Sequence, residues 1–179
     1  MNQVNRFYNI IGSMSLTLWT QLMAAVKDSI RLILSNSALK ETIKITVINY
    51  GSTARIVFKE QEPHLDLIDK IKNNGGGTDF ENALTLTYDT LLESKSKYDI
   101  YTIGFLTDGQ AGYPQKIIDR INEDSENVKS KINFNCILFG NQSSNLETIS
   151  NSLNANYTNA INFEQLKNSF KEILIPIKK

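Results

Sequence analysis

The chain has 179 residues, which is enough for one domain with a sizeable hydrophobic core. Its 19 Lys and Arg residues balance its 19 Asp and Glu residues, which argues against a nucleic-acid partner, because such a partner requires a clustered basic excess. No run of about 18 apolar residues is present, so we expect no membrane span, and the lack of an apolar signal-peptide stretch at the start favours a cytoplasmic location.

The first predicted elements are a strand over Val4–Ile11 and a helix over Thr17–Leu34. Asn5, Arg6 and Asn9 make the strand more polar than a central strand usually is. For that reason we expect the domain to belong to a larger protein. The helix has a wide apolar face, as expected for a helix that packs on a sheet.

Two alternating segments, Ile43–Asn49 and Ala54–Lys59, follow with only four residues between them. Strands this close in sequence pair as a hairpin, so we expect one antiparallel strand at an edge of the sheet. A short helix is predicted over Leu65–Ile71, and the glycine run Gly75–Gly77 indicates a loop.

A capping box predicts the start of the next helix, with Thr78 as N-cap and Glu81 three residues later. The helical pattern continues to about Leu92. The apolar segment Tyr98–Leu106 comes next and indicates a central parallel strand that is buried on both faces. Asp108 follows directly, at the end of the strand where open α/β sheets bind their ligands.

The remaining segments continue the alternation of helices and strands, which indicates one α/β domain over residues 1–179. The predicted fold is a doubly wound, mostly parallel, Rossmann-like sheet with helices on both faces. The segments are a helix over Pro114–Val128, a strand over Ile132–Phe139, a helix over Leu146–Leu153, a strand over Asn156–Ala160 and a helix over Phe163–Leu174.

Three turns carry polar side chains toward the same edge of the predicted sheet. They contain Ser13, Thr78 and Asp108. Oxygen ligands from separate loops suit a hard cation such as Mg²⁺. Each residue also has an ordinary role as a turn or capping residue, and on local pattern alone that simpler interpretation is favoured.

The order of these turns gives the chain a recognisable overall pattern. Gly-Ser-Met-Ser before an amphipathic helix, Gly-Gly-Gly-Thr-Asp-Phe in the middle and Phe-Leu-Thr-Asp-Gly-Gln after a later strand together resemble the von Willebrand factor A (VWA) domain family. The resemblance covers nearly the whole chain. It implies a doubly wound α/β fold that binds protein ligands, with a metal-ion-dependent adhesion site of the form Asp-x-Ser-x-Ser, a Thr and an Asp.

The resemblance places the Thr of this site on Thr78 and the last Asp on Asp108. The first motif aligns in two ways, and the positions of Gly12 and Met14 favour the first of them. One alignment puts Asn9 at the Asp and Ser13 at the second Ser, with Ile11 at the first Ser; the other matches Ser13 and Ser15 and leaves Ile11 at the Asp. Both lack the first carboxylate, and cation affinity depends on ligand charge and number. We therefore expect a degenerate site with weak or no Mg²⁺ binding.

Two functional hypotheses remain open at this point. The first is a non-enzymatic protein-interaction module of VWA type, with Ser13, Thr78 and Asp108 at its ligand rim. The alternative is a small α/β hydrolase or phosphoryl-transfer enzyme that uses Asp108 with Ser13 or Thr78. Such an enzyme needs a second acid or base close by, and Asp79 is the only local candidate.

Overall fold

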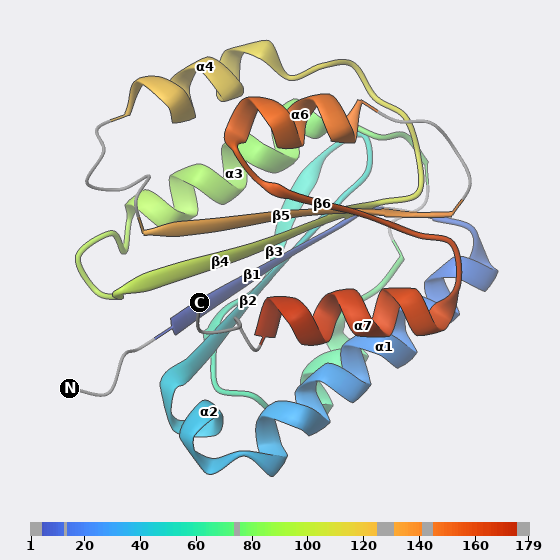
Figure 1. The fold of residues 1–179 in the computed structure, drawn as a ribbon, viewed down its shortest axis with the longest axis vertical. Helices are drawn as coiled ribbons and strands as arrows, with labels where there is room; N and C mark the ends of the chain where they lie inside the picture. The colour runs from blue at the N-terminus through green and yellow to red at the C-terminus, as the bar shows by residue number, and fades with distance from the viewer. Residues whose placement is uncertain (1–4, 13, 74–75, 125–130, 141–144, 175–179) are drawn as a thin grey trace.

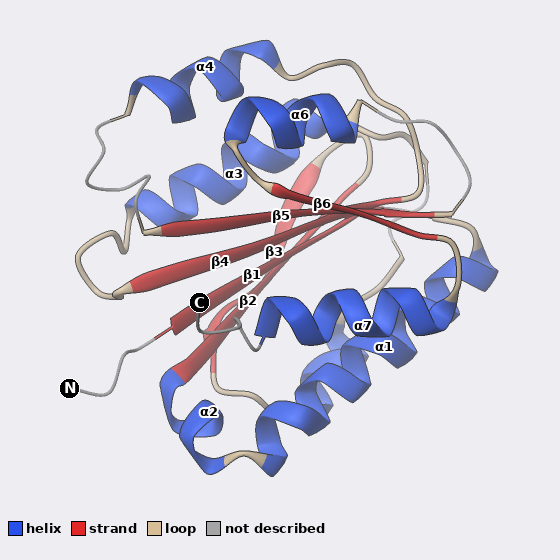
Figure 2. Cartoon of the chain, in the orientation of Figure 1, coloured by secondary structure: helices blue, strands red, loops and turns tan. Residues whose placement is uncertain are grey.

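A computed structural model describes residues 5–12, 14–73, 76–124, 131–140 and 145–174. Six strands form one sheet in the order β3-β2-β1-β4-β5-β6, and only the β2–β3 pair is antiparallel. The predicted hairpin with an antiparallel edge strand is thereby confirmed. The strands are β1 (Asn5–Gly12), β2 (Ile43–Tyr50), β3 (Ala54–Gln61), β4 (Ile100–Thr107), β5 (Ile132–Phe139) and β6 (Asn156–Ala160) (Figure 2).

Helices cover both faces of this sheet, as the predicted fold class requires (Figure 1). One face packs against α1 (Leu16–Ser35) and α7 (Phe163–Leu174). The opposite face packs against α3 (Phe80–Leu92), α4 (Gln115–Glu123) and α6 (Leu146–Leu153). Each face has its own apolar core, because successive side chains of a strand point to opposite faces. None of the helices in the described ranges is long and apolar enough to cross a membrane.

The polar first strand, β1, lies in the middle of the sheet, between β2 and β4. Arg6 is 0% exposed there, and its guanidinium forms an ion pair of 2.8 Å with Glu60 of β3. It also donates hydrogen bonds to Thr46 (3.2 Å) and Ser94 and lies over the ring of Tyr8. A buried charge is tolerated only with such partners. Long-range pairing therefore explains how a polar strand can be central.

The structure differs from the predicted elements at three places. A short helix, α2 (Ser37–Thr42), fills the connection between α1 and β2, and its six residues are too few to give a periodic signal. The segment Leu65–Lys70 is a 3₁₀ helix, η1. The predicted helix from Pro114 begins at Gln115 and is described to Glu123, and its predicted continuation at 125–128 lies outside the described residues.

Candidate functional site

The carboxyl ends of the parallel strands form one edge of the sheet, and Asp108 lies on it directly after β4. Thr107 shapes the turn, because its hydroxyl accepts a hydrogen bond of 3.1 Å from the N–H of Gly109. The Asp108 side chain is partly buried. The structure therefore places this carboxylate at the edge where ligands of open α/β sheets bind.

The start of α1 holds the carboxylate of Asp108 in place. Burial raises the pKa of Asp108, while hydrogen bonds from the backbone N–H groups of Ser15 and of Asp108 itself lower it in part. The carboxylate thus lies at the positive end of a helix, where an anion is stabilised. Ser15 is also the N-cap of α1, since its hydroxyl accepts from the N–H of Leu18 at 3.4 Å.

Asn73 fixes the turn between β1 and α1 from the opposite side. Its amide accepts from the N–H of Met14 at 3.4 Å and donates to the carbonyl of Met14 at 2.7 Å. Sequence reasoning did not identify Asn73, because 59 residues separate it from Met14 and no local pattern marks it. Ser13, a predicted site residue, lies outside the described residues.

Thr78 reaches the same edge, but it does not cap α3. The N-cap is Asp79, whose carboxylate accepts from the N–H of Asn82 at 3.0 Å. Glu81 instead accepts a hydrogen bond of 3.0 Å from the N–H of Ile117 in α4. The predicted capping box is therefore wrong. Thr78 and Asp79 are both suited to capping and are adjacent in the sequence. The hydrogen bond from Ile117 to Glu81 removes Glu81 from a capping box with Thr78, and Asp79 is the N-cap.

The hydroxyl of Thr78 points toward the Asp108–Gly109 turn. A Cβ atom added at Gly109 would lie 3.3 Å from Thr78 Oγ1, so the second and third loops are in close contact. Gly77 makes the approach possible with a φ of +72°, and a Cβ there would lie 2.9 Å from the side chain of Ser52. Thr78 thus lies against the turn that carries Asp108.

Tyr50 packs behind this edge of the sheet, and sequence reasoning did not identify it as a supporting residue. Its buried hydroxyl donates a hydrogen bond of 3.1 Å to the carbonyl of Leu106, two residues before Asp108. A Cβ atom at Gly12 would lie 3.0 Å from that hydroxyl. The residue before Ser13 is therefore a glycine because the ring of Tyr50 occupies the space of a side chain.

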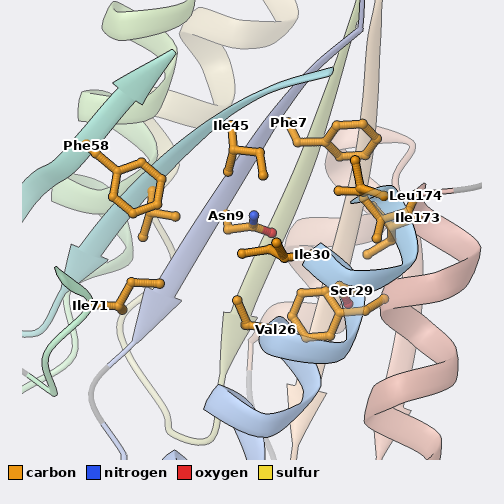
Figure 3. A pocket seen from close by; sticks show the side chains of 13 residues that line it. Phe7, Asn9, Val26, Ser29, Ile30, Ile45, Phe58, Ile71, Ile173 and Leu174 are labelled. Atoms are coloured by element: carbon orange, nitrogen blue, oxygen red, sulfur yellow. The ribbon is translucent and has the colours of Figure 1, made fainter. Parts of the chain in front are cut away.

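Asn9 does not lie at this edge. It pairs in register with Gly104 of β4, four residues before Asp108, which corresponds to about 13 Å along a strand. Figure 3 shows the Asn9 side chain in a cavity of about 20 Å³ between the sheet and the helices, with Ile30, Ile45 and Phe58 among its neighbours. The alignment that places Asn9 at the missing carboxylate is therefore wrong.

The second alignment agrees with the contact between Ser15 and Asp108 and leaves Ile11 at the carboxylate position. Ile11 is buried in the core that faces α1. Within the described ranges, no group of three or more His, Cys, Asp or Glu side chains could hold a metal ion. The described residues of the edge offer Mg²⁺ the carboxylate of Asp108 and hydroxyl groups, because the nearby carboxylate of Asp79 is engaged as the N-cap of α3. A metal with a strong preference for charged oxygen ligands fits this set poorly.

Among the residues that the structure describes, the acid and base candidates proposed beside Asp108 are already engaged in other contacts. Asp79 is engaged as the N-cap of α3, and its second oxygen accepts from the side-chain amide of Asn82 at 2.6 Å. Glu81 is engaged with the backbone of α4. His64 lies at the start of η1 and accepts a hydrogen bond from the N–H of Asp66. None of these contacts favours the hydrolase or phosphoryl-transfer hypothesis.

Exposed apolar side chains flank the polar residues of the edge. Leu16, the first residue of α1, is 78% exposed, and Ile161, which directly follows β6, is 55% exposed. An open groove of about 490 Å³ lies at Thr78, with Ser52 and Tyr113 also in its lining. We call the surface made by Ser15, Leu16, Thr78, Asp108 and Ile161 the rim.

Comparison with known proteins connects this geometry to one family. The sequence profile of the von Willebrand factor type A domain matches residues 12–172. Among curated proteins, none matches the chain significantly.

Solved structures share the fold at low sequence identity. A von Willebrand factor type A protein from Catenulispora acidiphila superposes with a TM-score of 0.70 at 17% identity, over 96% of this chain and 42% of that one. Proximal thread matrix protein 1 from the mussel byssus gives 0.68 at 16% identity, over 96% and 47%. The PilB minor pilin from Streptococcus sanguinis gives 0.68 at 13% identity, over 96% and 61%. This chain spans about half the length of these proteins.

Proposed function

Because the chain belongs to the von Willebrand factor type A family, we propose that it is a non-enzymatic protein-interaction module that binds a protein partner at the rim. Domains of this family are generally protein-interaction modules. Residues 1–179 act as one such domain in this proposal. A role without catalysis also agrees with the engagement of Asp79 and Glu81 in other contacts, which leaves no second free acid or base beside Asp108 in the described part of the chain.

The observation that carries the proposal is the exposure of Leu16 and Ile161 at the same end of the sheet as Asp108. Leu16 follows Ser15, whose backbone N–H bonds the Asp108 carboxylate, and Ile161 follows β6, two strands from β4. Burial of one such side chain by a partner contributes about 1.5–3 kcal/mol. The hydroxyl of Thr78 and the carboxylate of Asp108 can then fix the orientation of the partner by hydrogen bonds.

Metal plays a minor part in this binding mode. With Ile11 at the position of the missing carboxylate, Asp108 is the one charged ligand that the described rim supplies. Mg²⁺ affinity should therefore be weak, and the partner should bind in the presence of a chelator. Ser13 belongs to the proposed site through its place in the sequence motif, two residues before Ser15.

The test is affinity capture with the full chain as immobilised bait, in buffer with EDTA and in buffer with Mg²⁺. The double variant Leu16→Asp, Ile161→Asp should reduce capture of the specific partner by about tenfold or more, because each change removes buried apolar area. Ser96→Asp is the matched control, since Ser96 is exposed in the turn before β4, at the opposite end of the sheet. Equal capture by the wild type and the double variant, or capture that requires Mg²⁺, would contradict the proposal.

A further inference from the structure

A second hollow lies on the face of the sheet that carries α7, well away from the rim. It has a volume of about 550 Å³, within the range of small-ligand sites, about 300–1,000 Å³. Thr102 belongs to it and comes six residues before Asp108, a distance of about 20 Å along a strand. We call this hollow the asparagine groove. Its lining residues are Thr102, Asn133, Asn135, Ile137, Asn156, Tyr157, Thr158, Ser169, Glu172 and Ile173.

Strand alternation gathers the polar side chains of the groove on one face. Asn133 and Asn135 of β5 alternate with Phe134 and Cys136, which point into the core under α4 and α6. Asn135 pairs in register with Asn156 of β6 on one side and with Gly104 of β4 on the other. Side-chain atoms of Asn9 and Ile173 cover Gly104, at 3.5 and 3.8 Å from where its Cβ would lie, so they bound the row of amides on that side. Asparagine is unfavourable in strands, so strand propensity does not explain this concentration.

Several polar groups of the groove have no hydrogen-bond partner among the described residues. The amide of Asn156 donates to Asn135 at 3.0 Å, and Asn135 donates to the carbonyls of Asn133 and Ile103. These bonds leave the side-chain amide of Asn133 and the hydroxyls of Thr102 and Thr158 without a described partner. Thr102 is only 4% exposed. The hydroxyl of Thr102 lines the groove, where a bound molecule can form its hydrogen bond in place of water.

The charge of the lining restricts the kind of ligand. Among the described residues, no Lys, Arg or His lines the groove, so its described lining offers phosphorylated and other anionic ligands no counter-charge. Glu172 of α7 is the one ionisable carboxylate of the lining. Ile137 and Ile173 add apolar surface between the amides and hydroxyls. The groove is therefore neutral, rich in groups that both donate and accept, and partly apolar.

We propose that the asparagine groove binds a neutral oligosaccharide. A sugar hydroxyl both donates and accepts hydrogen bonds, and the side-chain amides of Asn133 and Asn156 can also do both. The carboxylate of Glu172 accepts a hydrogen bond from a further sugar hydroxyl. Ile137 and Ile173 pack against the C–H face of a sugar ring. The site is distinct from the rim, because the two share no residue.

The test is a titration of the ¹⁵N-labelled full chain, followed by NMR, with three neutral trisaccharides: cellotriose, maltotriose and chitotriose. At least one should shift the side-chain amide signals of Asn133 and Asn156 at millimolar concentration. The double variant Asn133→Ala, Asn156→Ala should weaken that binding by about tenfold or more, the equivalent of 1.4 kcal/mol. Asn159→Ala is the matched control, because Asn159 is exposed on the same strand but lies outside the groove lining.

Four results would overturn the proposal. The first is the absence of shifts with all three sugars, which would leave only a solvated sheet face. The second is binding that persists in the double variant while thermal melting shows it to be folded. The third is tighter binding of a sulfated heparin disaccharide than of any neutral sugar. The fourth is a response only to an extended neutral peptide, with shifts confined to the backbone amides of β6, which would indicate edge-strand pairing.

Discussion

Asn9 provides a sharp test of how the sheet is placed relative to the rim. Its amide faces an apolar cavity between the sheet, α1 and α7 and has no hydrogen-bond partner among the described residues. Asn9→Leu should therefore stabilise the protein. Asn9→Asp, which would restore a carboxylate if Asn9 belonged to the metal site, should destabilise it and leave Mg²⁺ affinity unchanged.

The size of both effects follows from desolvation. A buried amide without a partner costs about 1–3 kcal/mol in proteins. Because Asn9 is only partly buried, the gain for Asn9→Leu should be near the lower end, about 1 kcal/mol. The cavity of about 20 Å³ leaves room for the different shape of leucine. A charged carboxylate in the same place should cost about 2 kcal/mol or more.

The loss in Asn9→Asp should also depend on pH. Apolar surroundings raise the pKa of a buried carboxyl group above its unfolded value of about 3.9. Below that value the group is neutral in both states and the penalty is small. As the pH rises through the unfolded and then the folded pKa, the unfolded state ionises first, and the loss of stability reaches its full size.

Urea unfolding, followed by the fluorescence of Trp19, measures all of these changes. Trp19 lies on α1 and packs partly buried against the same core. A gain of 1 kcal/mol should shift the midpoint upward by about 0.5 M urea. A lower midpoint for Asn9→Leu, an unchanged midpoint for Asn9→Asp, or a tenfold gain of Mg²⁺ affinity in Asn9→Asp would refute the placement of Asn9 in the cavity.

Two further predictions concern capping and the buried charge. Asp79→Ala should lower the free energy of unfolding by about 1 kcal/mol, because it removes the N-cap of α3. Thr78→Ala should leave that free energy nearly unchanged. Equal losses for the two variants in urea unfolding would contradict the assignment of Asp79 as the N-cap. Burial raises the pKa of Glu60, but hydrogen bonds from Lys97 and Tyr98 and the charge of Arg6 hold it below its usual range. Stability should therefore fall as the pH drops below about 4.3, and Glu60→Gln should flatten that dependence in acid-unfolding curves.

Much of the fold could be predicted from sequence, because its elements have strong local periodicity. The strands Ile132–Phe139 and Asn156–Ala160 and the helices Leu146–Leu153 and Phe163–Leu174 begin and end at the predicted residues. Apolar runs and turn residues set these boundaries locally. The central place of Tyr98–Leu106 also followed from its composition, since a strand buried on both faces lacks polar alternation.

The parts that could not be predicted depend on distant partners. Arg6 marked β1 as too polar for the centre of a sheet, and only Glu60, which β3 brings to it, explains its burial. Asn73 forms a hydrogen bond with Met14, although the first helix and the hairpin separate the two residues in the sequence. The position of Asn9 along β1 relative to the edge of the sheet became clear only from its register with β4. Register determines which face of the sheet each side chain occupies and where along the strand it lies. Short motifs carry none of this information.

Calorimetric titration of the wild-type chain with Mg²⁺ and with Mn²⁺ tests most directly whether the rim works without a strongly bound metal. We predict no binding in the micromolar range for either ion, because the described rim supplies Asp108 as its one carboxylate. Micromolar binding that Asp108→Ala abolishes would contradict this account, since it would show that the rim holds its metal despite Ile11.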